Sequence, residues 1–296
     1  MAKSLRQRET IAGYSFLAPA YILYLLFLAV PLVVSLILAF LQVDRFDLST
    51  EFVGLSNFEW VLGDPRFWRT FRNTFYFIAL AVVGNVGLGL VLAVLLDRNI
   101  PGPLLYLFRL AYFLPVLVSL AFVSFIWRFL FSFDLGVINY YIRILGLTPV
   151  GWLTDKNVVM LSIVIIDVWK NVGFFVIILV AALQGVPRNL MEAARIDGAS
   201  PLTTLRRIKL PYIAPVILFC VTYATIGGLQ VFDSIKIITD GGPGDSTRSV
   251  VMYMFSEAFS AGNLGTGAAS AVTLLVVIAA VTATQLALAR RVARRS

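Results

Sequence analysis

Long stretches with few or no charged residues constrain this chain more than any other feature of its sequence. A bilayer core about 30 Å thick requires about 20 mostly apolar residues in a helix that crosses it. Six segments meet this requirement: one within Thr10 to Val43, then Asn73 to Leu96, Leu110 to Trp127, Val158 to Leu183 with polar interruptions, one near Ile213 to Phe232, and one within Ala268 to Ala289. The sequence therefore predicts an all-α membrane protein with about six transmembrane helices.

The composition agrees with a membrane protein. Of the 296 residues, 59% are hydrophobic and 14% are charged, whereas soluble domains carry about 25% charged residues. Lys3, Arg6 and Arg8 precede the first apolar segment. That segment is too long for a signal peptide and lacks a small-residue cleavage site, so we expect an uncleaved first helix.

Basic residues are distributed unevenly between the predicted connections. The two termini and the connections Asp97 to Arg109 and Val186 to Leu210 hold fourteen basic and four acidic residues, a balance of +10, whereas the rest of the chain holds ten basic and twelve acidic residues, a balance of −2. Because basic connections stay in the cytoplasm, both termini are predicted to be cytoplasmic. This topology explains the positive charge without a nucleic-acid partner. The tail 290–296 is expected to contact anionic lipid headgroups, with lipid-specific recognition as the alternative.

Residues needed for common catalytic centres are missing from the sequence. The chain has no histidine and a single cysteine, Cys220, which excludes a Ser-His-Asp triad and a histidine metal cluster. None of its five lysines follows a glycine in the phosphate-binding pattern GxxxxGK[ST]. If ATP powers this protein, another chain hydrolyses it.

The connection from Gly185 to Pro211 is too long to be a simple link, and it contains residues that typically begin and end helices. Pro187 suits the first turn of a helix, and Gly198 suits the left-handed residue that ends it. Ser200 can cap a second helix with Pro201 at its first position. The connection therefore predicts two short helices, the second of which should stop by Pro211.

Two interpretations of this connection follow from its side chains. Small residues around the bend would let the surface of another protein approach closely, and two acidic residues offer hydrogen-bond acceptors beside it. The alternative is an amphipathic helix that lies on the bilayer. The residues concerned are Glu192, Ala193, Ala194, Asp197, Gly198 and Ala199.

The same connection resembles the EAA loop of membrane subunits in binding-protein-dependent ATP-binding-cassette importers. The matching residues are Glu192-Ala193-Ala194, Asp197-Gly198-Ala199 and Ile208-Lys209-Leu210-Pro211. Leu205 departs from the pattern, which usually has phenylalanine there. In such proteins the bend around Gly198 is the coupling helix, which sits in a cleft of the ATPase. The resemblance thus implies an ATPase-coupling loop that includes Glu192, Ala193, Ala194, Asp197, Gly198, Ala199, Leu205 and Pro211.

Further matches resemble sugar permeases of the maltose and glycerol-phosphate type, and together they run from about Gly54 to beyond Pro243. They are Gly54 to Phe58, Asn73-Thr74, Leu114-Pro115 and Thr239 to Pro243. The resemblance implies a type I importer transmembrane domain in a bacterial or archaeal cytoplasmic membrane. It also implies three partners: a second homologous permease subunit, a dimer of ATP-binding-cassette ATPase subunits, and an extracytoplasmic solute-binding protein. No cofactor is expected in this chain, because ATP and Mg²⁺ would bind to the ATPase subunits.

Three segments are expected on this basis. Residues 1–70 would form an N-terminal segment with the first transmembrane helix and an extracytoplasmic loop. Residues 71–289 would form the importer transmembrane domain, with its coupling loop at 185–211. Residues 290–296 would form a basic cytoplasmic tail.

Polar residues inside the fourth span mark a candidate substrate path. Asp167, Lys170, Asn171 and Phe174 are spaced i, i+3, i+4 and i+7 and therefore share one helical face. A charge near the centre of a span costs about 2.5 to 3.5 kcal/mol, whereas an intrahelical pair returns about 0.2 to 0.5 kcal/mol. This difference favours a hydrated cavity over a purely structural Asp167–Lys170 pair, and the resemblance to maltose-type subunits supports it. Weaker candidates in the fifth span are Gly228, Gln230 and Asp233.

The sequence therefore predicts a permease subunit of an importer for a carbohydrate or sugar-like solute. An ion-coupled secondary carrier is the alternative, because it would also use carboxylates such as Asp167 and Asp233. Such a carrier would not need the two-helix connection. An intramembrane enzyme fits less well, since the chain lacks histidine and paired intramembrane carboxylates.

A cysteine placed at the predicted cytoplasmic bend tests the orientation. In a Cys220→Ala background, Ser200→Cys should resist membrane-impermeant thiol reagents in intact cells, because the charge bias places residue 200 in the cytoplasm. Labelling is measured by mass shift before and after the cells are permeabilised. Rapid labelling of intact cells would show that the orientation is inverted.

Overall fold

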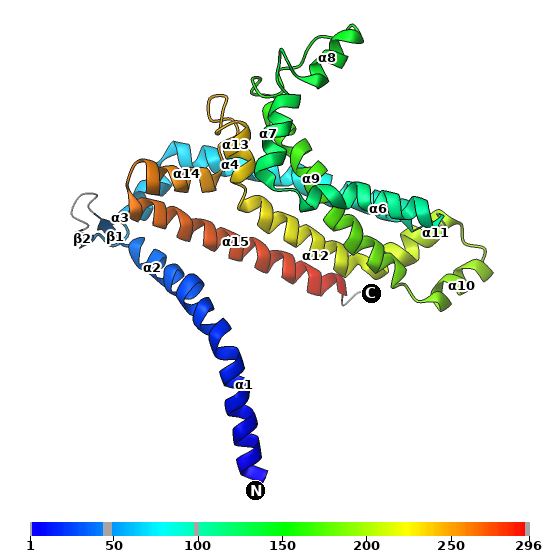
Figure 1. Cartoon of the computed structure of the whole chain (residues 1–296), viewed down its shortest axis with the longest axis horizontal. Helices are drawn as coiled ribbons and strands as arrows, with labels where there is room; N and C mark the ends of the chain where they lie inside the picture. The colour runs from blue at the N-terminus through cyan, green and yellow to red at the C-terminus, as the bar shows by residue number, and fades with distance from the viewer. Residues whose placement is uncertain (1, 44–48, 98–100, 294–296) are drawn as a thin grey trace. The chain divides into compact units, whose positions relative to one another are not determined.

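The computed structural model describes residues 2–43, 49–97 and 101–293, which are mostly helical (Figure 1). The chain divides into two compact units. Unit 1 comprises Met1–Asp64 and Met254–Thr273, and unit 2 comprises Pro65–Tyr253 and Leu274–Ser296.

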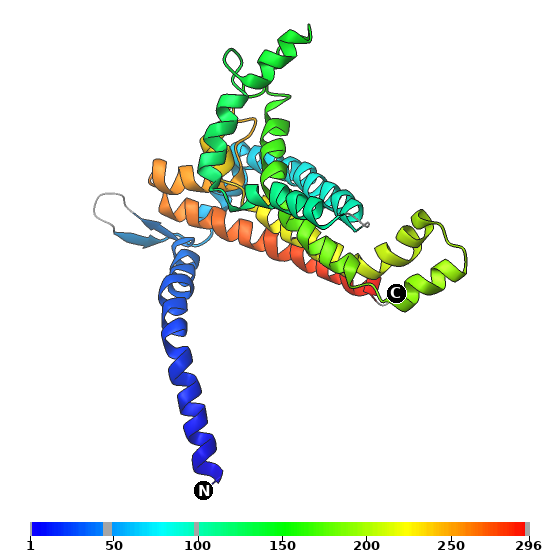
Figure 2. The same cartoon turned by 45° about the vertical axis from the view of Figure 1, so that its right-hand side comes forward.

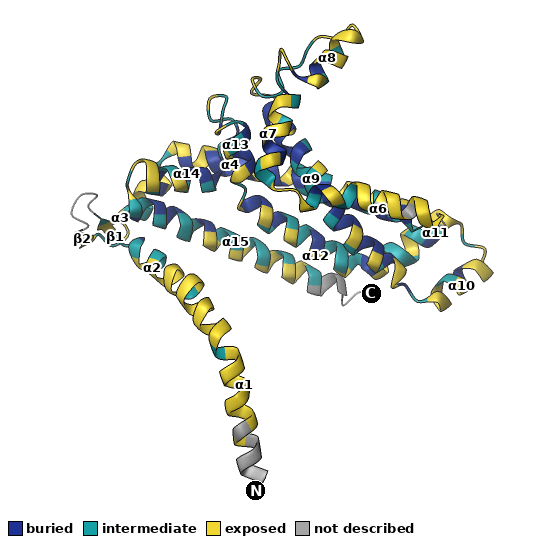
Figure 3. Ribbon diagram, in the orientation of Figure 1, coloured by how far each residue is buried: buried dark blue, intermediate teal, exposed yellow. Residues whose placement is uncertain are grey.

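Unit 1 contains the first predicted span and a small β-ribbon. Its elements are α1 (Ala2–Tyr24), η1 (Leu25–Ala29), α2 (Val30–Leu38), β1 (Leu41–Val43), β2 (Thr50–Phe52), α3 (Ser56–Gly63), η4 (Ser256–Ser260) and the first part of α15 (Leu264–Ala293). The span runs over Glu9–Leu38, and its most apolar window has no buried residue, as the exposed colouring of α1 and α2 shows (Figure 3). This surface requires lipid or another chain to cover it.

The first span, Glu9–Leu38, agrees with the predicted range, and it ends at Leu38 because the chain then turns into a strand. Residues 41–43 pair antiparallel with residues 50–52, with Leu41 opposite Phe52. Asn57 fixes this change of direction, since its Nδ2 donates to the carbonyl oxygens of Ala39 at 3.1 Å and Leu41 at 3.0 Å. The Gly54 to Phe58 match thus has a structural role in unit 1.

Unit 2 holds the remaining spans and the two-helix connection (Figures 1 and 2). Its elements are α4 (Pro65–Val82), η2 (Val83–Leu88), α5 (Gly89–Leu96), α6 (Gly102–Leu117), α7 (Leu120–Leu130), α8 (Val137–Ile144), α9 (Val159–Gln184), α10 (Arg188–Ile196), α11 (Pro201–Thr204), η3 (Leu205–Lys209), α12 (Leu210–Leu229), α13 (Asp233–Ile238), most of α14 (Val250–Phe255) and the second part of α15. The η segments are single π-helical turns within longer helices.

Five continuous helices among the described residues are long and apolar enough to cross a membrane, and a bent pair forms a sixth candidate. The prediction of one helix over Leu110 to Trp127 is wrong. Helix α6 ends at Leu117, α7 begins at Leu120, and the two are bent by 101°. Val118 and Ser119 between them are extended, with ψ of 138° and 133°. Non-helical backbone at membrane depth is tolerated where it is buried in protein or lines a cavity.

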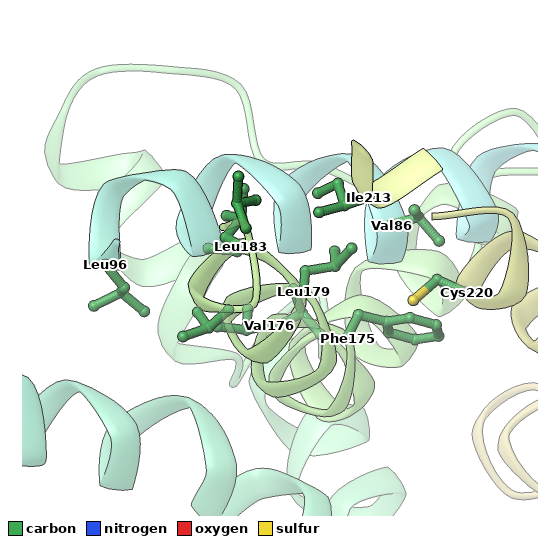
Figure 4. Packing of buried hydrophobic residues seen from close by; sticks show 12 residues of the cluster. Val86, Leu96, Phe175, Val176, Leu179, Leu183, Ile213 and Cys220 are labelled. Carbon is green, nitrogen blue, oxygen red and sulfur yellow. The ribbon is translucent and has the colours of Figure 1, made fainter. Parts of the chain in front are cut away.

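Helix α9 is the centre of unit 2. Its apolar residues Phe175, Val176, Leu179 and Leu183 pack against α5 and against Ile213 and Cys220 of α12 (Figure 4). Two glycines of the second span allow close packing against α9: a Cβ on Gly84 would lie 2.5 Å from Val168, and one on Gly89 would lie 3.0 Å from Phe175. Gly87, by contrast, faces open space.

The loop after α13 contains the Thr239 to Pro243 match, and hydrogen bonds from α4 hold this loop in place. Asn73 Nδ2 donates to the carbonyl oxygens of Asp245 at 2.8 Å and Arg248 at 3.2 Å. The next residue, Thr74, accepts the backbone N–H of Val250 at 3.1 Å. The Asn73-Thr74 match therefore anchors a loop more than 170 residues away in the chain.

Candidate functional site

The first helix of the connection ends as predicted. Helix α10 is followed by Asp197 and then by Gly198, whose φ is +69°. The N–H of Gly198 donates to the carbonyl of Arg195 at 3.1 Å, and that of Ala199 donates to Ala194 at 2.9 Å. This pair of bonds is the Schellman motif, in which a left-handed residue closes a helix. Glycine is the residue that adopts this conformation most easily.

The second helix begins as predicted but does not stop at Pro211. The Ser200 side chain accepts the N–H of Thr203 at 3.2 Å, and Pro201 occupies the first turn. The helix then passes through η3 into α12 and continues to Leu229. Leu210 donates to the carbonyl of Leu205, one residue further back than in an α-helix, so a π-helical turn precedes Pro211. Proline is tolerated in a first turn, and here it falls just after the helical register changes.

The bend between the two helices presents one large apolar side chain among charged ones. Ile196 is 86% exposed at the end of α10, and Glu192, Ala193, Asp197 and Gly198 are exposed beside it. Ala194, by contrast, is 5% exposed and faces inward. An apolar side chain as exposed as Ile196 fits contact with another protein or with a membrane surface. We call residues 188–204 the hairpin.

An ion pair just beyond the hairpin joins the end of η3 to the residue that follows α5. Lys209 Nζ lies 2.5 Å from Asp97 Oδ2, and both side chains are largely shielded, with 20% and 15% exposure. Lys209 is the last residue of η3, and Asp97 directly follows α5. The hairpin is thus connected to the core helices by charge as well as by the chain itself.

The second candidate site is a cavity of about 280 Å³ that lies between α4, α9 and α12 and reaches the end of α6. From the predicted set, Asp167, Asn171, Phe174 and Gly228 line it. Phe174 and Tyr223 form an aromatic wall, with ring centroids 4.8 Å apart and planes inclined by 32°.

Asp167 is the polar centre of this cavity. Its Oδ2 accepts from Asn85 Nδ2 at 2.7 Å, and its Oδ1 accepts from Asn171 Nδ2 at 2.9 Å. Both carboxylate oxygens therefore have amide donors, which is how a carboxylate withstands burial. Asn171 belongs to α9 itself, whereas Asn85 belongs to η2, so the bond from Asn85 also connects the second span to the fourth.

Lys170 does not join this group, although it shares the predicted face. Its Nζ donates to the carbonyl oxygen of Val116 at 3.1 Å, near the end of α6. The break after α6 frees carbonyl groups that water cannot reach in lipid, and a cation at a helix C-terminus is favourable. The two charged residues thus have separate partners, and a simple Asp167–Lys170 pair does not describe them.

Two predicted residues lie outside the cavity. Gln230 follows the end of α12, Asp233 begins α13, and both are exposed. The helix ends at Leu229, so these side chains do not continue the face of α12 that carries Gly228. A Cβ on Gly228 would lie 2.8 Å from Ile78, which makes Gly228 a close-packing position as well as a lining residue.

Sequence reasoning missed most of the lining residues, among them Asn85, Val116 and Tyr223. Asn85 was identifiable as a candidate from the sequence, because it is an amide within an otherwise apolar span and is flanked by Gly84 and Gly87. Among the residues that the structure describes, no group of three histidine, cysteine or acidic residues could hold a metal ion.

The comparisons with known proteins agree with this geometry. Residues 85–294 match the family model described as binding-protein-dependent transport system inner membrane component. A sulfoquinovosyl glycerol transport system permease protein from Agrobacterium fabrum is 34% identical over 283 residues, covering 95% of this chain and 91% of the relative. A trehalose/maltose transport system permease protein from Thermococcus litoralis is 31% identical over 290 residues, covering 98% and 97%.

A solved structure confirms the fold. One chain of a bacterial ABC transporter involved in the import of the acidic polysaccharide alginate superposes with a TM-score of 0.87 and 21% identity, covering 98% of this chain and 99% of that chain. The predicted importer fold is thereby confirmed, and the family match favours an importer permease over an ion-coupled carrier. This chain belongs to the family of inner membrane components of binding-protein-dependent transport systems.

Proposed function

We propose that this chain is the permease subunit of an ATP-driven importer that carries a carbohydrate or sugar-like solute. The observation that carries the proposal is the course of α9, which connects both candidate sites. Asp167, Asn171 and Phe174 in α9 line the cavity, and only residues 185–187 separate the end of α9 from the hairpin. A displacement of the hairpin would therefore be transmitted along one helix to the cavity.

The hairpin would dock on an ATPase subunit. Its exposed Ile196 supplies an apolar anchor, and the rigid bend at Gly198 fixes the direction of that anchor. ATP and Mg²⁺ would bind to the ATPase dimer, because this chain has no phosphate-binding loop. Eight residues remain the proposed coupling set: Glu192, Ala193, Ala194, Asp197, Gly198, Ala199, Leu205 and Pro211.

The cavity would hold the solute. Amide and carboxylate groups can bond to hydroxyls, and the wall of Phe174 and Tyr223 offers a stacking surface for a sugar ring. A second permease subunit and an extracytoplasmic binding protein would complete the transporter. Apolar surface is available for such a subunit in the groove of about 440 Å³ between α6 and α9, lined by Tyr106, Leu110, Phe113 and Ile177.

Both termini would be cytoplasmic in this assembly. Within unit 2, the end of α15 lies at the same end as the hairpin (Figures 1 and 2), as the charge bias requires. We keep the division into an N-terminal segment (1–70), a transmembrane domain (71–289) and a basic tail (290–296) as part of this proposal. Arg294 to Ser296 lie outside the described residues.

Gly198 provides the test of coupling. A Cβ at Gly198 meets no atom within 4 Å, so Gly198→Val changes the backbone preference without a clash. The left-handed conformation then costs about 1 to 2 kcal/mol, which would depopulate the bend about 5- to 30-fold. Uptake should fall, and ATP hydrolysis by the complete transporter should stop responding to loaded binding protein.

Gly146 supplies the matched control. Its φ is +73°, and its Cβ position is also open, but it follows α8, near the other end of α9 (Figure 1). Gly146→Val should therefore retain coupled hydrolysis. Normal uptake by the Gly198→Val transporter would refute the coupling assignment.

Asn171 and Phe174 provide the test of the cavity. Asn171→Ala removes one hydrogen-bond donor to Asp167, and Phe174→Ala removes part of the aromatic wall. A lost hydrogen bond typically costs about 0.5 to 1.5 kcal/mol, so the KM for uptake should rise roughly two- to tenfold. The amount of assembled complex, measured by co-purification, should stay near that of the parent.

Leu161 serves as the control on the same helix, because its side chain is exposed outside the cavity. Leu161→Ala should leave the KM unchanged. If the two cavity variants lose only assembly, or import with the parental KM, α9 does not line the solute path.

A further inference from the structure

Asn85 has a buried atom with no hydrogen-bond partner. The residue is 3% exposed, and its Nδ2 is engaged with Asp167. Its Oδ1 has no partner in the structure. A buried acceptor left without a donor costs about 1 to 3 kcal/mol, so this atom is suited to a donor that arrives from outside the chain.

The position of Asn85 places its buried amide in the wall of the cavity. Asn85 lines the cavity and lies within the π-helical turn η2. Single π-helical turns often occur at functional sites, because the extra residue changes the direction of the side chains. The neighbouring Gly84 brings this turn against Val168 of α9. The turn therefore holds Asn85 beside Asp167 at close range.

The charges around the cavity are one-sided. Asp167 engages one N–H of each of the Asn85 and Asn171 amides, and its carboxylate is the one charged group among the described lining residues. None of the described residues that line the cavity carries a positive charge. Lys170 is the cation nearest in sequence, and it is bonded to the carbonyl of Val116 and is not part of the lining.

We propose that this cavity selects an uncharged, hydroxyl-rich solute and rejects anionic sugars, and that Asn85 Oδ1 accepts a hydrogen bond from one solute hydroxyl. This inference rests on the proposed import function and adds the charge class of the solute. An anionic group would meet the Asp167 carboxylate, and no described residue of the lining supplies a compensating positive charge. A cationic group would have to leave water for a cavity otherwise lined mostly by Phe77, Ala81, Phe175 and Val231.

Uptake of a charged-and-neutral solute panel tests the charge class. The complete transporter, expressed with its partner subunits, is offered trehalose, maltose and lactose as neutral probes, glucuronate and glycerol 3-phosphate as anions, and glucosamine as a cation. We expect ATP-dependent uptake of at least one neutral sugar and of no charged probe. Uptake of a charged probe at a comparable rate would overturn the charge selection but leave carbohydrate import intact. If no probe is imported, the import proposal fails and the inference fails with it.

The role of Asn85 is tested with deoxy analogues of the imported neutral sugar. In the parent, one monodeoxy analogue should bind about tenfold more weakly, because the hydroxyl that donates to Asn85 Oδ1 is missing. In Asn85→Ala, the parent sugar should weaken by a similar factor, and that analogue should lose nothing further. A structural role would instead weaken the sugar and every analogue equally, and this result would overturn the assignment.

Ser124 is the matched control for a buried polar atom. Its side chain is 0% exposed, and its Oγ also has no partner, but it lies on α7 and does not line the cavity. Ser124→Ala should therefore import every analogue with the parental KM. Co-purification of the partner subunits confirms that each variant assembles, and Asn85→Gln provides a second variant that retains an acceptor if Asn85→Ala does not assemble.

Discussion

Hydrocarbon offers no hydrogen-bond partner, so each polar group in a membrane span must find one within the protein or in a wet cavity. Asp167 shows how this chain meets the requirement. Its carboxylate oxygens accept from Asn85 in η2 and Asn171 in α9. The bond from Asn85 connects the second and fourth spans, and both bonds place polar atoms beside an aromatic wall. The hydrogen bonds that stabilise the Asp167 carboxylate therefore also build the candidate solute site.

The broken third span follows the same rule. Where α6 ends at Leu117, its last carbonyls lose their helical partners, and Lys170 donates to one of them. Val116 at that end also lines the cavity. The break in the third span therefore adjoins the cavity. At the end of α9, the hairpin is fixed by its Schellman bend and by the Lys209–Asp97 pair. Helix α9 therefore runs from the polar cavity to within three residues of the hairpin.

Much of this arrangement was predictable from local sequence signals. Charge-free runs located the spans, and the fourth was accurate to one residue at each end. The bend at Gly198 was predictable, because the glycine that ends one helix and the serine and proline that begin the next lie within a few residues of each other. The strand at Leu41 and the break after Leu117 were not predictable, since both are decided by distant contacts that apolar composition does not encode. Helical spacing predicted which face of α9 carries the polar residues. It could not predict Asn85, the hydrogen-bond partner of Asp167, because Asn85 lies 82 residues away in the chain. The prediction that the second helix stops by Pro211 was wrong, because a π-helical turn before this proline allows the helix to continue.

Uptake into proteoliposomes separates ATP-driven import from the other ways in which a polar cavity could serve a membrane protein. The complete transporter is reconstituted with its binding protein, and labelled neutral sugar is followed under two conditions: ATP on the hairpin side without an ion gradient, or a proton or sodium gradient without ATP. ATP-driven import predicts accumulation in the first condition only. Accumulation driven by the ion gradient in the absence of ATP would contradict the proposed coupling between the hairpin and the cavity.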